Sequence, residues 1–323
     1  MKKKLVMLGF VALVSSTFLF AQSQYKLIST IPLDGSGGWD YLRADEVTNR
    51  LFVSHDSQVH VIDLTTGKQV GVVPNLKGVH GIAIANDLNK AFISCGRDSS
   101  VVIVDLKTLQ FIAKVKVTGA NPDAIFYDDF SHLVLTYNGG SANATVLDGK
   151  THKVLKTIPL DGKPEFSVSD GAGKIFVNNE DKSMIYSINT KTLAVENKWS
   201  IAPGEEPSGL ATDRITHRLF SVTDNLMVVL DSETGKVVTT VPIGDRVDGV
   251  MFDPEKKRIY TSNGTGTVTV VEEVNANTFK VVETIPTRAG ARTIGINTKT
   301  HRIYLPALDD NKKFVVLEIG YAK

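Results

Sequence analysis

Residues 79–120 contain four short segments rich in β-branched and other apolar residues: VHGIAIA (79–85), AFISC (91–95), SVVIVDL (100–106) and FIAKVKV (111–117). Asn, Asp, Gly and Ser gather between the segments, and these residues favour turns. Short apolar runs bounded by turn residues are typical of β-strands joined in hairpins. The stretch therefore predicts a compact unit of four antiparallel strands.

The same unit recurs along almost the whole chain. Complete units begin near Trp39, Val79, Pro122, Pro164, Pro207 and Val247. A last unit, from Ala291, contains three segments, while the isolated segment YKLISTIPL (25–33) resembles a fourth segment such as KVLKTIPL (153–160). Four-stranded units of about 40–45 residues are typical of propeller blades. We therefore predict an all-β, seven-bladed β-propeller whose ring closes when the N-terminal strand completes the last blade.

An open all-β solenoid is the alternative fold, but it does not explain an orphan strand at one end that matches a missing strand at the other. Ring closure also hides sheet edges that an open array exposes. Residues 22–323 are accordingly interpreted as a single propeller domain. The turns between first and second segments and between third and fourth segments are stereotyped, as in DLTTGK (63–68) and DSETGK (231–236). They share one face of the predicted disc, and we interpret that face as scaffold.

The N-terminus is typical of a secretory signal peptide. Lys2, Lys3 and Lys4 precede an apolar run from Leu5 to Phe20, and Ala21 marks the expected cleavage site. We expect residues 1–21 to be removed and the rest to be periplasmic or secreted, although an uncleaved anchor is the alternative. No later stretch is long and apolar enough to span a membrane.

Charge and cysteine content exclude several classes of protein. The formal net charge is +1 and basic residues are spread evenly, which gives no signal for nucleic-acid binding. Cys95 is the single cysteine, so the chain forms no internal disulfide. We find no nucleophile elbow, phosphate loop or paired-cysteine metal motif. The sequence names no cofactor, and we expect a monomer.

The segments VVIVDLKTLQ (101–110) and RIYTSN (258–263) resemble the core of the YVTN repeat. Over residues 25–323 the chain is similar to secreted YncE-like propellers, which are built from forty-residue repeats of this kind. The resemblance implies a seven-bladed fold and a general binding scaffold. It implies no particular activity, and proline precedes the first strand in fewer repeats than is usual for that family.

One polar residue occupies the same place at the start of every repeat, at intervals of 40 to 44 residues. These residues are Asp40, His80, Asp123, Glu165, Ser208, Asp248 and Arg292. The first strand of a blade is innermost, so their side chains are predicted to converge on one mouth of the axial channel. Loops between second and third segments add further candidates on the same face: His55, Arg97, Asn138 and Asn179.

Three hypotheses follow for this ring. The leading one is a binding propeller that holds a small polar ligand, or a loop of a protein partner, at the mouth. The second is a metal-dependent hydrolase, lactonase or lyase in which His80, Asp123 and Glu165 act together and Arg292 holds a carboxylate or phosphate. The third is a protein-interaction scaffold with a solvated channel and no small ligand. Whether the protein is an enzyme stays open at this point.

Overall fold

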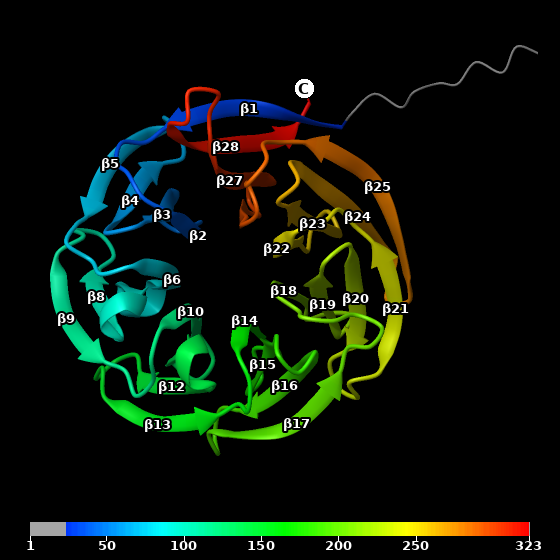
Figure 1. Ribbon diagram of the computed structural model, residues 1–323, viewed down its shortest axis with the longest axis horizontal. Coiled ribbons are helices and arrows are strands. Elements are labelled where there is room, and N and C mark those ends of the chain that lie inside the picture. The colour runs from blue at the N-terminus through cyan, green and yellow to red at the C-terminus, as the bar shows by residue number, and fades with distance from the viewer. Residues whose placement is uncertain (1–23, 323) are drawn as a thin grey trace, which may run out of the picture.

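The computed structural model describes residues 24–322, which form 28 β-strands and three short 3-10 helices. The strands make seven four-stranded sheets, each ordered by simple antiparallel neighbours and arranged around one axis (Figure 1). The chain is thus a closed seven-bladed β-propeller, as predicted. The predicted signal peptide lies outside the described residues. Among residues 24–322, no helix has the length and apolar character needed to cross a bilayer.

Blades 1 to 3 follow one another along the chain. Blade 1 contains β2 (Trp39–Asp45), β3 (Arg50–His55), β4 (Gln58–Asp63) and β5 (Lys68–Val73). Blade 2 contains β6 (Val79–Ala85), β7 (Lys90–Cys95), β8 (Ser100–Asp105) and β9 (Phe111–Lys116), with η1 (Asn86–Leu88) and η2 (Gly96–Asp98) in its turns. Blade 3 contains β10 (Pro122–Asp128), β11 (Leu133–Asn138), η3 (Gly139–Ser141), β12 (Asn143–Asp148) and β13 (Val154–Pro159).

Blades 4 to 6 repeat the arrangement, and blade 7 combines both ends of the chain. Blade 4 contains β14 (Pro164–Ser169), β15 (Lys174–Asn179), β16 (Met184–Asn189) and β17 (Ala194–Ser200). Blade 5 contains β18 (Leu210–Asp213), β19 (Arg218–Thr223), β20 (Leu226–Asp231) and β21 (Val237–Pro242). Blade 6 contains β22 (Val247–Asp253), β23 (Arg258–Asn263), β24 (Thr267–Asn275) and β25 (Thr278–Pro286). Blade 7 contains β26 (Gly295–Asn297), β27 (Arg302–Leu308), β28 (Phe314–Tyr321) and β1 (Tyr25–Pro32).

The pairing of β1 with β28 closes the ring. The two strands are antiparallel in a register that runs from Tyr25 opposite Tyr321 to Pro32 opposite Val315. Ile31 of β1 is buried in an apolar cluster that spans blades 7 and 1. The N-terminal strand therefore contributes both ladder hydrogen bonds and core packing, as the sequence predicted.

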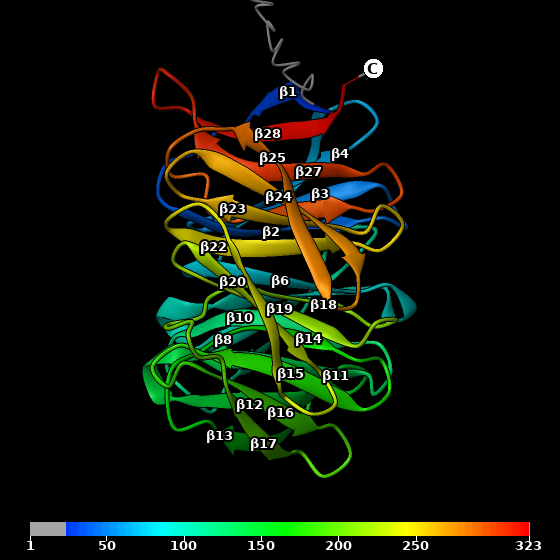
Figure 2. The same cartoon turned by 90° about the vertical axis from the view of Figure 1, so that its right-hand side faces the viewer.

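The loops divide between two faces of the disc, which Figure 2 shows from its edge. In blades 1, 2, 3, 4 and 6 the backbone of the loop between the second and third strands bonds to the link that enters the same blade; for example, the Asp56 amide donates to the Gly38 carbonyl at 2.9 Å and the Gly96 amide donates to the Gly78 carbonyl at 2.7 Å. We call this side the mouth face, because the strands that start here carry the polar ring. The stereotyped turns lie at the other ends of the strands, on what we call the turn face.

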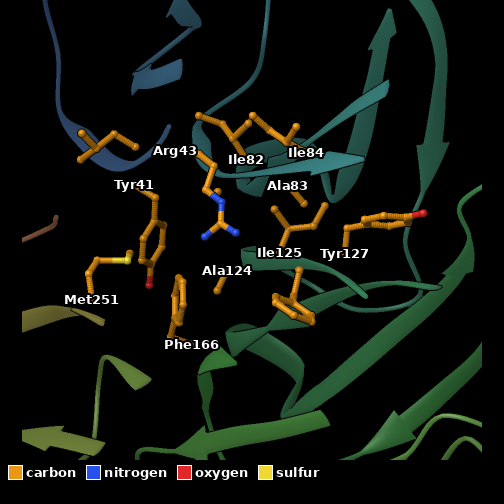
Figure 3. Close-up of a pocket in the computed structure, with 13 residues that line it drawn as sticks. Tyr41, Arg43, Ile82, Ala83, Ile84, Ala124, Ile125, Tyr127, Phe166 and Met251 are labelled. Carbon is orange, nitrogen blue, oxygen red and sulfur yellow. The ribbon is translucent and has the colours of Figure 1, made fainter. Parts of the chain in front are cut away.

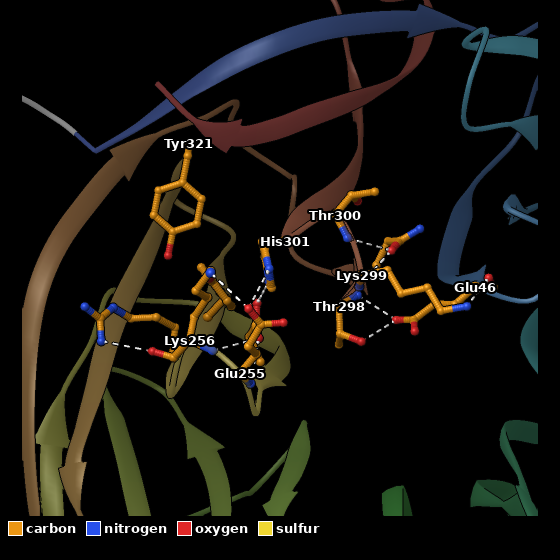
Figure 4. Close-up of polar contacts among 12 residues, drawn as sticks. Glu46, Glu255, Lys256, Thr298, Lys299, Thr300, His301 and Tyr321 are labelled. Atoms are coloured by element: carbon orange, nitrogen blue, oxygen red, sulfur yellow. Dashed lines mark hydrogen bonds and ion pairs between the residues drawn. The ribbon is translucent and has the colours of Figure 1, made fainter. Parts of the chain in front are cut away.

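Polar side chains connect neighbouring blades on the turn face (Figure 4). A carboxylate oxygen of Glu46, in blade 1, accepts hydrogen bonds from the Thr298 amide at 2.6 Å and the Thr298 hydroxyl at 2.8 Å, in blade 7. The His301 ring contacts the Asp253 carboxylate of blade 6 at 2.7 Å. These carboxylates are therefore engaged with neighbouring blades and are not free to bind a ligand.

Closure of the ring through β1 predicts that two substitutions by alanine, both on outer strands, change the free energy of unfolding by different amounts. Ile31→Ala, in β1, should lower the free energy of unfolding by about 2–4 kcal/mol, because it leaves a cavity in the core between blades 7 and 1. Val70→Ala, at an exposed position of the outer strand β5, should change it by about 0.5 kcal/mol or less. Denaturant unfolding measures both. Equal, small effects would show that β1 is not needed to hold the ring closed.

Candidate functional site

Register shifts at the start of the innermost strands aim the polar ring into the channel. In β2, β6, β10, β14 and β22 the pairing with the next strand shifts across the segment that holds the polar residue. A β-bulge leaves a residue out of the ladder and redirects its side chain. The affected residues are Asp40, His80, Asp123, Glu165 and Asp248. Ser208 and Arg292 lie just before β18 and β26, in the entering links.

Asp40, His80 and Asp123 meet at the mouth over blades 1 to 3. The Nδ1 atom of His80 lies 2.7 Å from a carboxylate oxygen of Asp40 and 3.5 Å from one of Asp123. Each of the three residues offers one atom that could bind a metal ion, and these three atoms all lie within 4.8 Å of one another. The hydrogen bond to Asp40 raises the pKa of His80 despite its burial. Burial and the charge of Asp40 raise the pKa of Asp123.

Glu165 does not join this group, contrary to the set of His80, Asp123 and Glu165 that the sequence indicated. Its carboxylate lies 2.6 Å from the ammonium group of Lys163, which also contacts Glu180. Burial is the main cause that raises the pKa of Glu165, and the charge of Asp123 adds to it. The ammonium group of Lys163 stays charged, because Glu165 and Glu180 outweigh its burial and raise its pKa. One cation thus serves two carboxyl groups.

A cavity of about 590 Å³ opens beside the triad, over blades 4 to 7. Its lining includes six carboxylate residues, namely Glu165, Glu180, Glu205, Glu206, Asp224 and Asp248, and three basic residues, namely Lys163, Arg246 and Arg292. The Arg292 guanidinium lies 3.2 Å from the Asp248 carboxylate. Burial nevertheless raises the pKa of Asp248 to about 6, since Arg292 opposes that shift without cancelling it. Negative groups therefore predominate around the cavity.

Tyr41 stands in the channel beneath the ring (Figure 3). Its ring packs against Phe166, with centroids 5.6 Å apart. Burial and the charges of Asp123, Glu165, Asp40 and Asp248 raise the pKa of its phenol. The phenol therefore stays protonated and can donate a hydrogen bond to an acceptor in the mouth.

The other predicted residues divide into one that faces solvent on the mouth face and three that are buried. Arg97 is exposed and pairs with Asp56. His55 packs on Phe314 inside the fold, with its Nδ1 atom 3.1 Å from the Nε2 atom of His60. Asn138 is buried and donates to Asn143 and Thr145 within its own blade. Asn179 is buried and donates to the Leu160 carbonyl at 2.6 Å. The structure does not bring these three to the mouth.

Sequence reasoning missed Lys163 and Tyr41. Lys163 precedes the ring position by two residues and Tyr41 follows it by one, so neither shares the repeat position that identified the ring. An available signal was charge balance: four carboxylates predicted to converge at one mouth favour a basic side chain nearby, since opposite charges favour the ionised form. Lys163 precedes Pro164 at the start of its repeat, so its basic side chain could have been predicted to lie near the ring.

Comparison with known proteins supports the fold and leaves the function open. No protein-family model matches the chain. It is 25% identical over 234 residues to "Antigen Lp49" of Leptospira interrogans serogroup Icterohaemorrhagiae serovar copenhageni (strain Fiocruz L1-130), covering 64% of this chain. The chain spans about half the length of that relative, 48%. This weak similarity is consistent with a propeller family and does not establish which one.

Solved structures share the architecture at low sequence identity. A chain of the "Crystal Structure of Mitotic Checkpoint Complex" matches with a TM-score of 0.81 and 11% identity, covering 100% of both chains. A chain of "Kuenenia stuttgartiensis Hydrazine Synthase" gives 0.75 and 15%, covering 86% of this chain and 95% of that one. "Structure of U3-55K" gives 0.79 and 8%, covering 90% and 98%. These likenesses define the class, a seven-bladed β-propeller, and they show the fold alone, because one fold hosts many unrelated functions.

The raised pKa of Glu165 predicts how stability depends on pH. Folded Glu165 keeps its proton at pH values where the unfolded carboxyl has lost it, so its contribution to stability falls as pH rises above about 4.5. Glu165→Gln removes this penalty and leaves Glu180 as partner of Lys163. The variant should melt close to the parent at pH 4.5 and about 2–4 °C higher at pH 8.

Glu205→Gln is the matched control, because Glu205 is exposed at the rim of the same cavity. Its melting temperature should follow that of the parent at both pH values. A Glu165→Gln variant that melts lower at pH 8 would show that the ion pair with Lys163 outweighs burial and repulsion.

Proposed function

We propose that the protein is a binding propeller whose mouth holds a small polar ligand that carries a positive charge, or a basic side chain from a partner loop. The observation that carries the proposal is the surplus of carboxylates at the mouth: six against three basic residues around the cavity, with the Asp40 and Asp123 carboxylates beside it. Partly buried carboxylates repel one another, and a bound cation relieves that repulsion. The cavity volume lies in the range of small-molecule sites, about 300–1,000 Å³.

Arg292 and Tyr41 give the site a second recognition element. The Arg292 guanidinium is half-exposed and reaches the cavity while contacting Asp248. It can accept an anionic group of a zwitterionic ligand, as a guanidinium does with carboxylates. The protonated phenol of Tyr41 supplies a further donor below the ring. A ligand with one positive and one negative group would match both charges of the mouth.

Cation binding is expected to release protons, because the carboxyl groups that bind the cation hold protons more tightly than usual. Calorimetric titration with arginine, choline and spermidine at pH 6, 7 and 8 tests this. At least one probe should bind more tightly as pH rises, with an enthalpy that depends on the buffer. Glu165→Gln should weaken that probe about tenfold.

Glu233→Gln, an exposed turn-face residue, provides the control and should bind like the parent. If none of the cationic probes bind, or if both variants bind alike, the ring is a solvated channel mouth. The protein would then be better described as an interaction scaffold.

A metal-dependent hydrolase, lactonase or lyase is the second candidate, and the compact set of Asp40, His80 and Asp123 favours it. Two carboxylates and an imidazole suit Zn²⁺ or Mn²⁺. A bound cation would polarise a carbonyl of the substrate next to the phenol of Tyr41. Zn²⁺ or Mn²⁺ should then raise the melting temperature of the parent, and His80→Asn should abolish the rise.

His132→Asn serves as the histidine control, since His132 lies in a turn-face loop beside Asp87. A rise that persists in His80→Asn, or that disappears equally in both variants, would contradict metal binding at the mouth.

Export of the protein is also proposed here. It is supported by the basic, apolar and small-residue pattern of residues 1–21. N-terminal sequencing of protein recovered from cells checks it: a chain that retains Met1 would contradict cleavage after Ala21.

A further inference from the structure

The channel has a second opening on the turn face, at the opposite end from the mouth. There a cavity of about 450 Å³ enters the channel between the innermost strands. Residues from all seven blades line it, and polar and charged side chains alternate there with half-buried apolar ones, among them Ile84, Phe126, Phe166, Val168, Met251 and Ile296. We call this cavity the basal pocket. The sequence had suggested that this face is scaffold alone.

Arg43 reaches into the channel at the inner end of the basal pocket. Figure 3 shows its guanidinium in the space among Tyr41, Ala124 and Phe166. The guanidinium has no hydrogen bond or ion pair with any of residues 24–322, although its side chain stays accessible to water. The surrounding protein lowers the pKa of Arg43, and the charge of Glu46 opposes that effect. An arginine keeps its charge in such a setting, so the pocket ends on a charged guanidinium whose donors have no partner among residues 24–322.

No carboxylate contacts the Arg43 guanidinium among the described residues, although the charge of Glu46 is near enough to favour its charged form. Asp45 accepts hydrogen bonds from the Val47 amide and the Asn86 side chain, both at 3.1 Å. Glu46 is bonded to Thr298, as described above. Arg214, at the edge of the same pocket, donates to the Ser169 carbonyl at 2.8 Å and has no carboxylate partner among the described residues. The two ends of the channel therefore differ in charge: carboxylates outnumber basic residues at the mouth, whereas two guanidinium groups at the base, Arg43 and Arg214, stand against two carboxylates, Asp45 and Glu46.

We propose that the basal pocket binds a small organic anion with an apolar body, such as a medium-chain or aryl carboxylate. The carboxylate pairs with both nitrogens of the Arg43 fork, and the apolar body packs against Ile84, Phe126 and Met251. A guanidinium binds a carboxylate through two parallel hydrogen bonds. The apolar walls add affinity that a free carboxylate such as acetate cannot use. This site is independent of the one proposed at the mouth.

Calorimetric titration of the full chain with octanoate tests the proposal, with 1-octanol as the neutral comparison. The parent should bind octanoate more tightly than octanol. Arg43→Gln should weaken octanoate about tenfold or more and leave octanol almost unchanged. Met251→Trp keeps the arginine and fills the pocket, so it should weaken both probes, and it decides the matter if Arg43→Gln fails to fold.

Arg97→Gln is the matched control, because it removes an exposed guanidinium from the mouth face. It should bind octanoate like the parent. Three results would overturn the proposal: no octanoate binding by the parent, equal binding of octanoate and octanol, or octanoate binding that survives both Arg43→Gln and Met251→Trp. Each of these results would mean that Arg43 lines the channel without binding an organic anion.

Discussion

Buried hydroxyl and amide groups that bond the backbone of the neighbouring blade hold the polar ring in place. The Ser94 hydroxyl donates to the Asp123 carbonyl, the Ser262 hydroxyl to the Arg292 carbonyl and the Thr293 hydroxyl to the Asp40 carbonyl. The amide of Asn178 does the same for Ser208. Four of the seven ring positions are thus fixed by the preceding blade. A buried carbonyl without such a partner would cost stability, so these bonds determine how the innermost strands approach one another.

This rigidity explains the electrostatics of the mouth. Because the backbone at the ring is held in place, the carboxyl groups of Asp123, Glu165 and Asp248 stay buried near other carboxylates, and burial first and repulsion second raise their pKa values. Gly81 allows the close approach of blades 2 and 3, since a Cβ there would lie 3.0 Å from the Ile125 amide nitrogen and 3.1 Å from the Asp123 carbonyl oxygen. Gly249 plays the same part between blades 6 and 7. A site built in this way meets a ligand with little reorganisation, which favours affinity.

The sequence predicted the fold well because the repeat period, the strand alternation and the missing fourth strand are local patterns. It also predicted the ring, since equivalent positions in a repeat occupy equivalent places. The sequence did not predict which side chains are buried or which ones pair with each other. Asn138 and Asn179 were assigned to loops of functional interest, but they end the strands β11 and β15, and their amides donate to buried side-chain and backbone partners. The pairing of Lys163 with Glu165 and the unpaired Arg43 depend on side-chain directions that the repeat does not encode.

The join between β1 and β28 has a consequence for how the chain acquires its shape. β1 pairs with β28, almost the whole described length of the chain away, so blade 7 cannot be completed until β28 has been synthesised. Every earlier blade can form its own hairpins first, because its strands are neighbours in sequence. Until then, the strands at both ends present unpaired edges that could join those of another molecule. Pairing of β1 with β28 thus covers these edges and ends the period in which the chain can associate with another molecule through them.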